Sequence, residues 1–150
     1  MPEPVTSGCV LGFDYGLKRI GVAVGQVITG TTSPLPVVKN KPALLWQKIL
    51  KLIDEWDPQA VIVGLPLSLD GAETPMSRQS RKFAQRIHGR SGLTVHLQDE
   101  RLSSKAAESR FAQLRAAGVK RRKHGADTDS IAAQVLLEDW LSRVNTTPGD

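Results

Sequence analysis

The chain has 150 residues, of which 40% are hydrophobic, so it is long enough for one domain with a well-formed core. It carries 20 Lys and Arg residues against 15 Asp and Glu residues, and this net charge of +5 favours a polyanionic partner over an acidic protein surface. A single cysteine excludes an intrachain disulfide. No apolar run has the roughly 20 residues of a membrane span, and residues 1–8 show no signal-peptide pattern. We therefore expect a cytoplasmic protein without membrane contact.

The first third of the chain predicts an antiparallel β-meander followed by a helix. Val10–Tyr15 and Ile20–Val24 have the composition of two strands joined by a tight turn. A third strand, Thr29–Val38, contains two prolines, which confine it to a sheet edge. Pro42 then opens a helix in which apolar residues recur at helical spacing until the pair Asp57-Pro58 ends it.

The remaining chain alternates between strands and helices. The predicted elements are the strand Ala60–Leu65, the helix Ser77–His88, the strand Leu93–Gln98 and the helices Ser103–Ala117 and Thr128–Val144. The first of these is continuously apolar, as a strand buried on both faces of a parallel sheet requires. We therefore predict one α/β domain over residues 1–150, with a mixed sheet made of a three-strand antiparallel meander plus parallel strands, helices on both faces, and frayed tails at residues 1–8 and 145–150.

Asp14 is the most unusual residue of this pattern, because it lies within the apolar run of the first predicted strand. Taking an ionised carboxylate out of water costs several kcal/mol unless a partner compensates, and the strand contains no basic residue. The compensating group must come from elsewhere, as a metal, a distant cation or a proton.

Further acidic residues stand at the ends of other predicted elements. Asp99 and Glu100 follow the strand Leu93–Gln98, at a carboxyl end, where open α/β sheets place their ligand crevice. Asp127 and Asp129 open the last helix, and Asp129 lies on the same face as its apolar residues. Either could cap that helix, and the first pair could be a solvated strand end, so the acids alone leave both interpretations open. Their convergence would require a cation between them, because like charges in one cleft raise one another's pKa.

Five short motifs follow one another along the chain. They are Gly12-Phe13-Asp14-Tyr15-Gly16, Lys18-Arg19-Ile20-Gly21-Val22-Ala23-Val24, Val63-Gly64-Leu65-Pro66 with Asp70-Gly71, Asp99-Glu100-Arg101-Leu102-Ser103, and Asp129-Ser130-Ile131-Ala132-Ala133. As a set they are highly specific, and the chain resembles the YqgF (RuvX) family over nearly its whole length, Val10–Leu141. Members of this family are RNase H-like proteins described as Holliday junction resolvases and as nucleases of the precursor of 16S ribosomal RNA.

The resemblance implies an RNase H-type active site, with Asp14, Glu100 and Asp129 at the three acidic positions of the family as catalytic residues and metal ligands. Strand alternation alone cannot choose between Asp99 and Glu100, so the family match is what selects Glu100 and leaves Asp99 as a structural neighbour. The implied cofactors are two Mg²⁺ or Mn²⁺ ions, since hard cations prefer carboxylate oxygens and the chain has no cluster of His and Cys. Asp14 would bridge the two ions, and the other two acids would each bind one.

The implied activity is metal-dependent hydrolysis of phosphodiester bonds in the processing of the 5′ end of pre-16S rRNA, a step of ribosome biogenesis. The alternative within the family is a Holliday junction resolvase acting on four-way DNA junctions. A resolvase needs a dimer to cut two strands symmetrically, whereas a monomer can trim an RNA precursor. The sequence shows no obvious dimer seam, so we expect a monomer or a weak homodimer.

Basic residues are expected to bring a nucleic acid to this acidic site through its phosphates. In the helix after Ser77, basic residues recur every four positions opposite an apolar stripe, and residues 120–124 form a basic loop shortly before Asp129. Either cluster alone more commonly means a solvated face. The predicted nucleic-acid-binding residues are Lys18, Arg19, Arg78, Lys82, Arg86, Arg101, Lys120, Arg121, Arg122, Lys123 and His124. Aromatic residues are few, which favours backbone contacts over base stacking.

Two other classes of function compete with the nuclease. The spacing of Asp14, Gly16 and Gly21 also resembles the phosphate-binding hairpin of actin-like ATPases and sugar kinases, but those folds close two such domains over a nucleotide and 150 residues hold only one. The chain could instead be a nucleic-acid-binding assembly factor that keeps the fold with weak catalysis, because acids at the family positions do not guarantee turnover.

Overall fold

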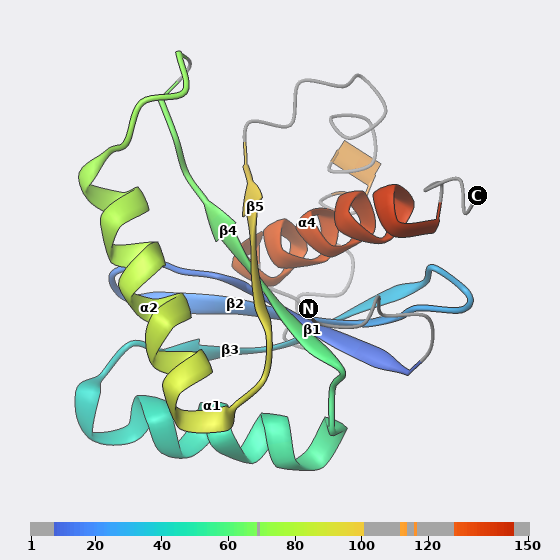
Figure 1. Cartoon of the computed structure of the whole chain (residues 1–150), viewed down its shortest axis with the longest axis horizontal. Coiled ribbons are helices and arrows are strands. Elements are labelled where there is room, and N and C mark those ends of the chain that lie inside the picture. Colours follow the sequence, from blue (N-terminus) through green and yellow to red (C-terminus); the bar gives the residue numbers. More distant parts are fainter. Residues whose placement is uncertain (1–7, 69, 101–111, 114–115, 117–127, 146–150) are drawn as a thin grey trace.

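A computed structural model describes residues 8–68, 70–100, 112–113, 116 and 128–145 of the chain. Its five strands form one sheet in the order β3-β2-β1-β4-β5 (Figure 1). The strands are β1 (Cys9–Asp14), β2 (Arg19–Gln26), β3 (Thr32–Lys39), β4 (Ala60–Leu65) and β5 (Val95–Asp99). The strand that carries Asp14 is therefore the central one.

The strand directions confirm the predicted mixed sheet. β1 pairs antiparallel with β2, and β2 pairs antiparallel with β3, which gives the three-strand meander. β1 pairs parallel with β4, and β4 pairs parallel with β5. The prolines Pro34 and Pro36 lie in β3 at the sheet edge, where a missing backbone donor is tolerated. The carboxyl ends of β1, β4 and β5 consequently meet at one end of the sheet.

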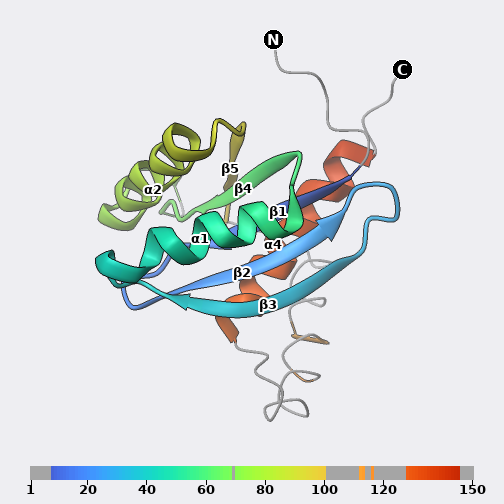
Figure 2. The same cartoon turned by 90° about the horizontal axis from the view of Figure 1, so that it is seen from below.

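The described helices cover both faces of the sheet, as predicted. Helices α1 (Pro42–Trp56) and α2 (Pro75–Ser91) lie on one face, and α4 (Thr128–Asn145) crosses the other (Figure 2). The helix predicted at Ser103–Ala117 lies outside the described residues, apart from positions 112, 113 and 116.

Several boundaries differ from the predictions by a few residues. β1 runs from Cys9 to Asp14, so Tyr15 is not part of it. β3 begins at Thr32 rather than Thr29, and β5 begins at Val95 rather than Leu93. Helix α2 begins at Pro75 rather than Ser77, because the residue before it caps the helix and proline suits the first helical turn.

The face covered by α1 and α2 holds the larger hydrophobic cluster. Side chains from β1, β2 and β4 pack there against Leu45 and Ile49 of α1 and against Phe83 and Ile87 of α2. The predicted apolar stripe of α1 is only partly buried, since Leu44 remains 46% exposed. No helix in the described part of the chain combines the length and hydropathy that crossing a membrane would require.

The opposite face of the sheet is covered by α4. Its residues Leu136, Leu137, Trp140 and Leu141 pack on strand side chains that include Val10, Ala23, Ala60 and Ile62. The buried surface of α4 extends beyond a single narrow stripe, because α4 lies across the middle of the sheet and contacts β1, β2, β3 and β4.

Candidate active site

Asp14 is the last residue of β1, at the carboxyl end of the central strand, and its side chain is half-buried. Side chains alternate along a strand, so Asp14 shares the α4 face with Val10, while Leu11 and Phe13 point to α1 and α2. Asp14 is thus less deeply buried than the apolar run suggested, because the strand ends at this residue.

Glu100 meets Asp14 from β5. The residue directly follows β5, and its backbone N–H donates to the carbonyl of Leu65 at 3.1 Å, which ties it to the end of β4. Its carboxyl group is hydrogen-bonded to that of Asp14. It lies over Gly64 so closely that a Cβ atom built on this glycine would be 2.1 Å from Glu100 Oε1. Two of the three predicted acids are therefore in contact.

The shared environment shifts the ionisation of both carboxyl groups. Burial raises the pKa of Glu100 to about 9, with further contributions from the hydrogen bond to Asp14 and from the charges of Asp14 and Asp99. Burial also raises the pKa of Asp14, against the opposing effect of its hydrogen bond to Glu100. Without a cation, the pair must hold a proton at neutral pH, because two adjacent carboxylates repel each other.

Asp99 precedes Glu100 and stands next to this pair. It is the last residue of β5 and pairs with Leu65 of β4. Its charge reaches Glu100, as the raised pKa of Glu100 shows, but the carboxyl group in contact with Asp14 is that of Glu100. Alternation along the strand left this choice open, because Glu100 lies just beyond the last residue of β5.

The third predicted acid, Asp129, is the second residue of α4, and its side chain lies outside what the structure describes, as does Asp127. The next residue, Ser130, is fully buried and donates to the carbonyl of Leu35 in β3 at 2.7 Å. It also accepts a long hydrogen bond of 3.5 Å from the backbone N–H of Val22 in β2. Since Gly21 is the cross-strand partner of Asp14, Ser130 anchors the first turn of α4 beside the end of β1 that carries Asp14.

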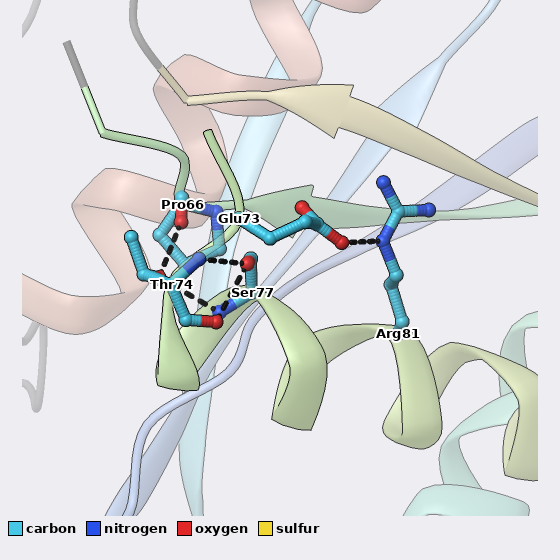
Figure 3. A network of polar contacts seen from close by, with 5 residues as sticks. All are labelled: Pro66, Glu73, Thr74, Ser77 and Arg81. Atoms are coloured by element: carbon cyan, nitrogen blue, oxygen red, sulfur yellow. Dashed lines mark hydrogen bonds and ion pairs between the residues drawn. The ribbon is translucent and has the colours of Figure 1, made fainter. Parts of the chain in front are cut away.

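The segment after β4 is fixed by a compact hydrogen-bond network (Figure 3). The Thr74 hydroxyl donates to the carbonyl of Pro66 at 2.9 Å and accepts from the backbone N–H of Ser77 at 3.1 Å, which caps α2. The Ser77 hydroxyl accepts from the backbone N–H of Thr74, and Arg81 pairs with Glu73. The network thus joins the start of α2 to Pro66. Pro66 directly follows Leu65, whose carbonyl accepts the hydrogen bond from the Glu100 backbone.

Five of the predicted nucleic-acid-binding residues lie in described parts of the chain. Lys18 and Arg19 are exposed in the turn after β1 and at the start of β2, and Arg78 is exposed on the first turns of α2. Lys82 and Arg86 are exposed on α2, and within the described part of the chain neither pairs with a carboxylate.

Lys82 and Arg86 line a cavity of about 180 Å³ between α1 and α2. Its wall includes Tyr15, the residue after Asp14, and Asn40, whose amide donates to the carbonyl of Gly16 at 2.8 Å. The sequence had no signal for this cavity, because its wall depends on how α1 and α2 pack. The other predicted nucleic-acid-binding residues, Arg101 and residues 120–124, lie outside the described residues.

Among the described residues, no group of three or more His, Cys, Asp or Glu side chains is placed to hold a metal ion. The donors that the structure does describe are the carboxyl oxygens of Asp14 and Glu100, and such oxygens suit hard divalent cations. A cation between them would take the place of the proton that the pair otherwise holds.

The mixed sheet and its covering helices form an RNase H-like fold. Solved structures agree with this fold: the RuvC protein of Thermus thermophilus, determined in complex with a Holliday junction substrate, superposes with a TM-score of 0.61 at 17% identity, over 93% of this chain and 97% of RuvC. The Holliday junction resolvase of fowlpox virus gives a TM-score of 0.54 at 15% identity, over 90% of this chain and 99% of the viral chain.

The chain belongs to the RuvX family, described as Holliday junction resolvase, whose family model matches residues 8–143. Curated relatives share 46% identity with it and bear the name "Putative pre-16S rRNA nuclease". The relative from Salmonella typhimurium aligns over 138 residues, or 91% of this chain and 98% of its own length. The relative from Pectobacterium carotovorum aligns over 136 residues, or 90% and 96%. These findings confirm the resemblance to a nuclease family that the five motifs predicted.

Proposed function

We propose that this protein hydrolyses phosphodiester bonds of the 16S ribosomal RNA precursor, at its 5′ end, in a divalent-metal-dependent reaction. The observation that carries the proposal is the contact between the carboxyl groups of Asp14 and Glu100 at the carboxyl end of the central strand. Relatives that share 46% identity over nearly their whole length and carry the pre-16S rRNA name support the choice of substrate.

The carboxyl pair fits a site for Mg²⁺ or Mn²⁺. Both side chains offer only oxygen donors, and the proton shared between them is the group that a cation would replace. When bound, a pair of such ions would supply an activated water and stabilise the charge on the attacking and leaving oxygens. Asp14 would bind both ions and Glu100 one, while the start of α4, anchored through Ser130, supports Asp129 as the third ligand.

The chain's own residues would align the substrate strand. The main-chain hydrogen bond from Glu100 to Leu65 ties the backbone of Glu100 to the end of β4 without a bound ion. Lys82 and Arg86 are exposed on α2, on the other face of the sheet from the carboxyl pair, so they would bind backbone phosphates at some distance along the strand from the cleaved bond. Lys18, Arg19 and Arg78, together with Arg101 and residues 120–124, would extend this contact along the strand.

A second candidate function is resolution of four-way DNA junctions. The description of the matching family model and the RuvC-like fold favour it. The two functions require the same carboxylates and differ in the nucleic acid and in the oligomeric state, since symmetric cleavage of a junction needs two active sites.

The decisive test is cleavage of precursor 16S RNA and of a matched four-way DNA junction, each with Mg²⁺ and with Mn²⁺. We expect the wild-type protein to cleave the RNA near its 5′ end and the Asp14→Asn variant to be inactive while remaining folded, because the amide cannot supply the carboxylate charge that the ions need. Asp54→Asn, the same change at an exposed position of α1, should cleave normally. Metal-dependent cleavage by Asp14→Asn would disprove the site, and exclusive cleavage of the junction would favour the second candidate.

A binding measurement separates the basic residues from the chemistry. Lys82→Gln with Arg86→Gln should weaken RNA binding and reduce the slope of log K against log salt by roughly 0.7 for each lost contact to a single strand. Lys48→Gln with Lys51→Gln removes the same charge from α1 and is the matched control. An equal loss in both double variants would show that only net charge matters. Tight binding by a wild-type protein that cleaves nothing would instead indicate an assembly factor.

A further inference from the structure

Gly64 lies at a position of β4 where a side chain would collide with Glu100. The strand is buried along its whole length, and Gly64 is next to its last residue. A Cβ atom on Gly64 would lie 2.1 Å from Oε1, 2.7 Å from Cδ and 2.9 Å from Cγ of Glu100, whereas heavy atoms in contact are normally about 3.5 to 4.0 Å apart. The Glu100 carboxyl group therefore fills the space that the missing side chain leaves.

The collision would affect the end of a flexible side chain and not the backbone or the packing of a helix. Other glycines on the same sheet face differ in this respect. A Cβ on Gly12 would meet Leu137 at 2.5 Å, and one on Gly25 would meet Leu141 at 2.9 Å, and both leucines are buried residues of α4. Gly12 and Gly25 thus let α4 approach the sheet, whereas the atoms nearest to Gly64 all belong to Glu100.

We propose that Gly64 is a positioning residue of the active site, which holds the Glu100 carboxyl group against Asp14 by having no side chain of its own. Gly64→Ala would push that carboxyl group away from Asp14, and the main-chain bond between Glu100 and Leu65 would keep the strand ends in place. The inference rests on the proposed function only in assigning Glu100 as a metal ligand.

The test compares Gly64→Ala with Gly25→Ala in two measurements: the thermal unfolding midpoint without divalent ions, and the Mn²⁺ concentration that gives half-maximal stabilisation. We expect Gly64→Ala to unfold near the wild-type temperature and to need about 10- to 100-fold more Mn²⁺, the range seen when supporting residues of a metal site are changed. Gly25→Ala should show the opposite behaviour, with a lower unfolding temperature and an unchanged Mn²⁺ midpoint, because its Cβ would collide with Leu141 of α4 and not with a carboxyl group of the site. Cleavage should fall with Mn²⁺ affinity in the first variant and remain in the second.

An unchanged Mn²⁺ midpoint in Gly64→Ala would overturn the proposal. If Gly64→Ala unfolds at a much lower temperature, the double variant Gly64→Ala with Glu100→Ala decides the matter. Recovery of stability on truncating Glu100 would locate the collision at that side chain and support the inference. A loss that persists would show that β4 needs glycine for its backbone and would contradict it.

The outcomes also separate this inference from the proposed function. A wild-type protein that is stabilised by Mn²⁺ but cleaves no nucleic acid would remove the proposed activity and leave the Gly64 measurement intact. Conversely, a wild-type protein that cleaves RNA, together with a Gly64→Ala variant that cleaves equally well, would keep the function and remove the positioning role.

Discussion

The two faces of the sheet carry side chains of different size. On the face covered by α1 and α2, the buried strand residues are mostly large, and they include Leu11, Phe13, Ile20, Val22, Val61 and Val63. On the face covered by α4 they are mostly small, and they include Gly12, Ala23, Gly25, Ala60 and Gly64. Both carboxyl groups of the candidate site lie on the second face.

This difference separates the residues that stabilise the fold from those that make room for chemistry. Large β-branched and aromatic side chains bury the most apolar area, and they concentrate where two helices cover the sheet. Small residues on the other face allow α4 to approach closely at Gly12 and leave space for a carboxyl group at Gly64. Substitutions on the two faces should therefore affect different properties.

The largest effect on stability is expected from Phe13→Ala. Phe13 is completely buried and meets the Phe83 ring edge-on, with ring centroids 5.8 Å apart. Truncation should lower the free energy of unfolding by about 3 to 5 kcal/mol, because the cavity lies where α2 packs on the sheet. Urea unfolding would measure the loss. A change within about 0.5 kcal/mol, as for an ordinary surface substitution, would contradict the assignment of this face as the main core.

On the α4 face, we expect the carboxyl pair to make the stability of the folded protein depend on pH. The pKa of Glu100 is raised to about 9 in the folded protein and is ordinary in the unfolded chain. At pH values between these two pKa values, the folded protein therefore binds one proton more than the unfolded chain does. The unfolding temperature without divalent ions should therefore fall as the pH rises from about 5 to 9. The raised pKa of Asp14 contributes in the same direction.

Glu100→Gln should flatten this pH dependence, because the amide keeps the shape of the side chain and does not titrate. Glu55→Gln, at an exposed position of α1, is the control and should keep the wild-type slope. Thermal unfolding in a chelator over this pH range would measure both variants. A stability that rises with pH in the wild-type protein would mean that the two carboxyl groups do not share a proton.

The contrast between the faces also shows what the sequence could reveal. Apolar periodicity predicted every described strand and helix, and two prolines correctly placed β3 at the edge. Asp14 stood out because a single carboxylate within an apolar run is a local pattern. The role of Gly64 depends instead on the pairing of β4 with β5, which brings Glu100 back over a residue 36 positions earlier in the chain, and no local pattern records that contact.

The starts of α2 and α4 show the same contrast between local and distant contacts. Thr74 and Ser77 have the spacing of a helix cap. This local pattern indicates that α2 begins at Pro75, directly after the capping residue Thr74. Ser130 gave no such signal, because its partners Val22 and Leu35 are about a hundred residues away in the sequence. Short-range polar contacts can be read from spacing, whereas those that connect distant elements require the fold.

The smallest effect on stability is expected from a glycine at which an added Cβ atom would have open space. Gly89 lies near the end of α2, and a Cβ atom there would meet no atom within 4 Å. Gly89→Ala should raise the free energy of unfolding by up to about 0.5 to 1 kcal/mol, because glycine loses more backbone freedom than alanine when a helix forms. Chemical denaturation would detect the gain, and the Mn²⁺ midpoint should not change. If Gly89→Ala and Gly64→Ala shifted that midpoint equally, the space beside Glu100 would have no special role, and the distinction between the two faces would lose its functional meaning.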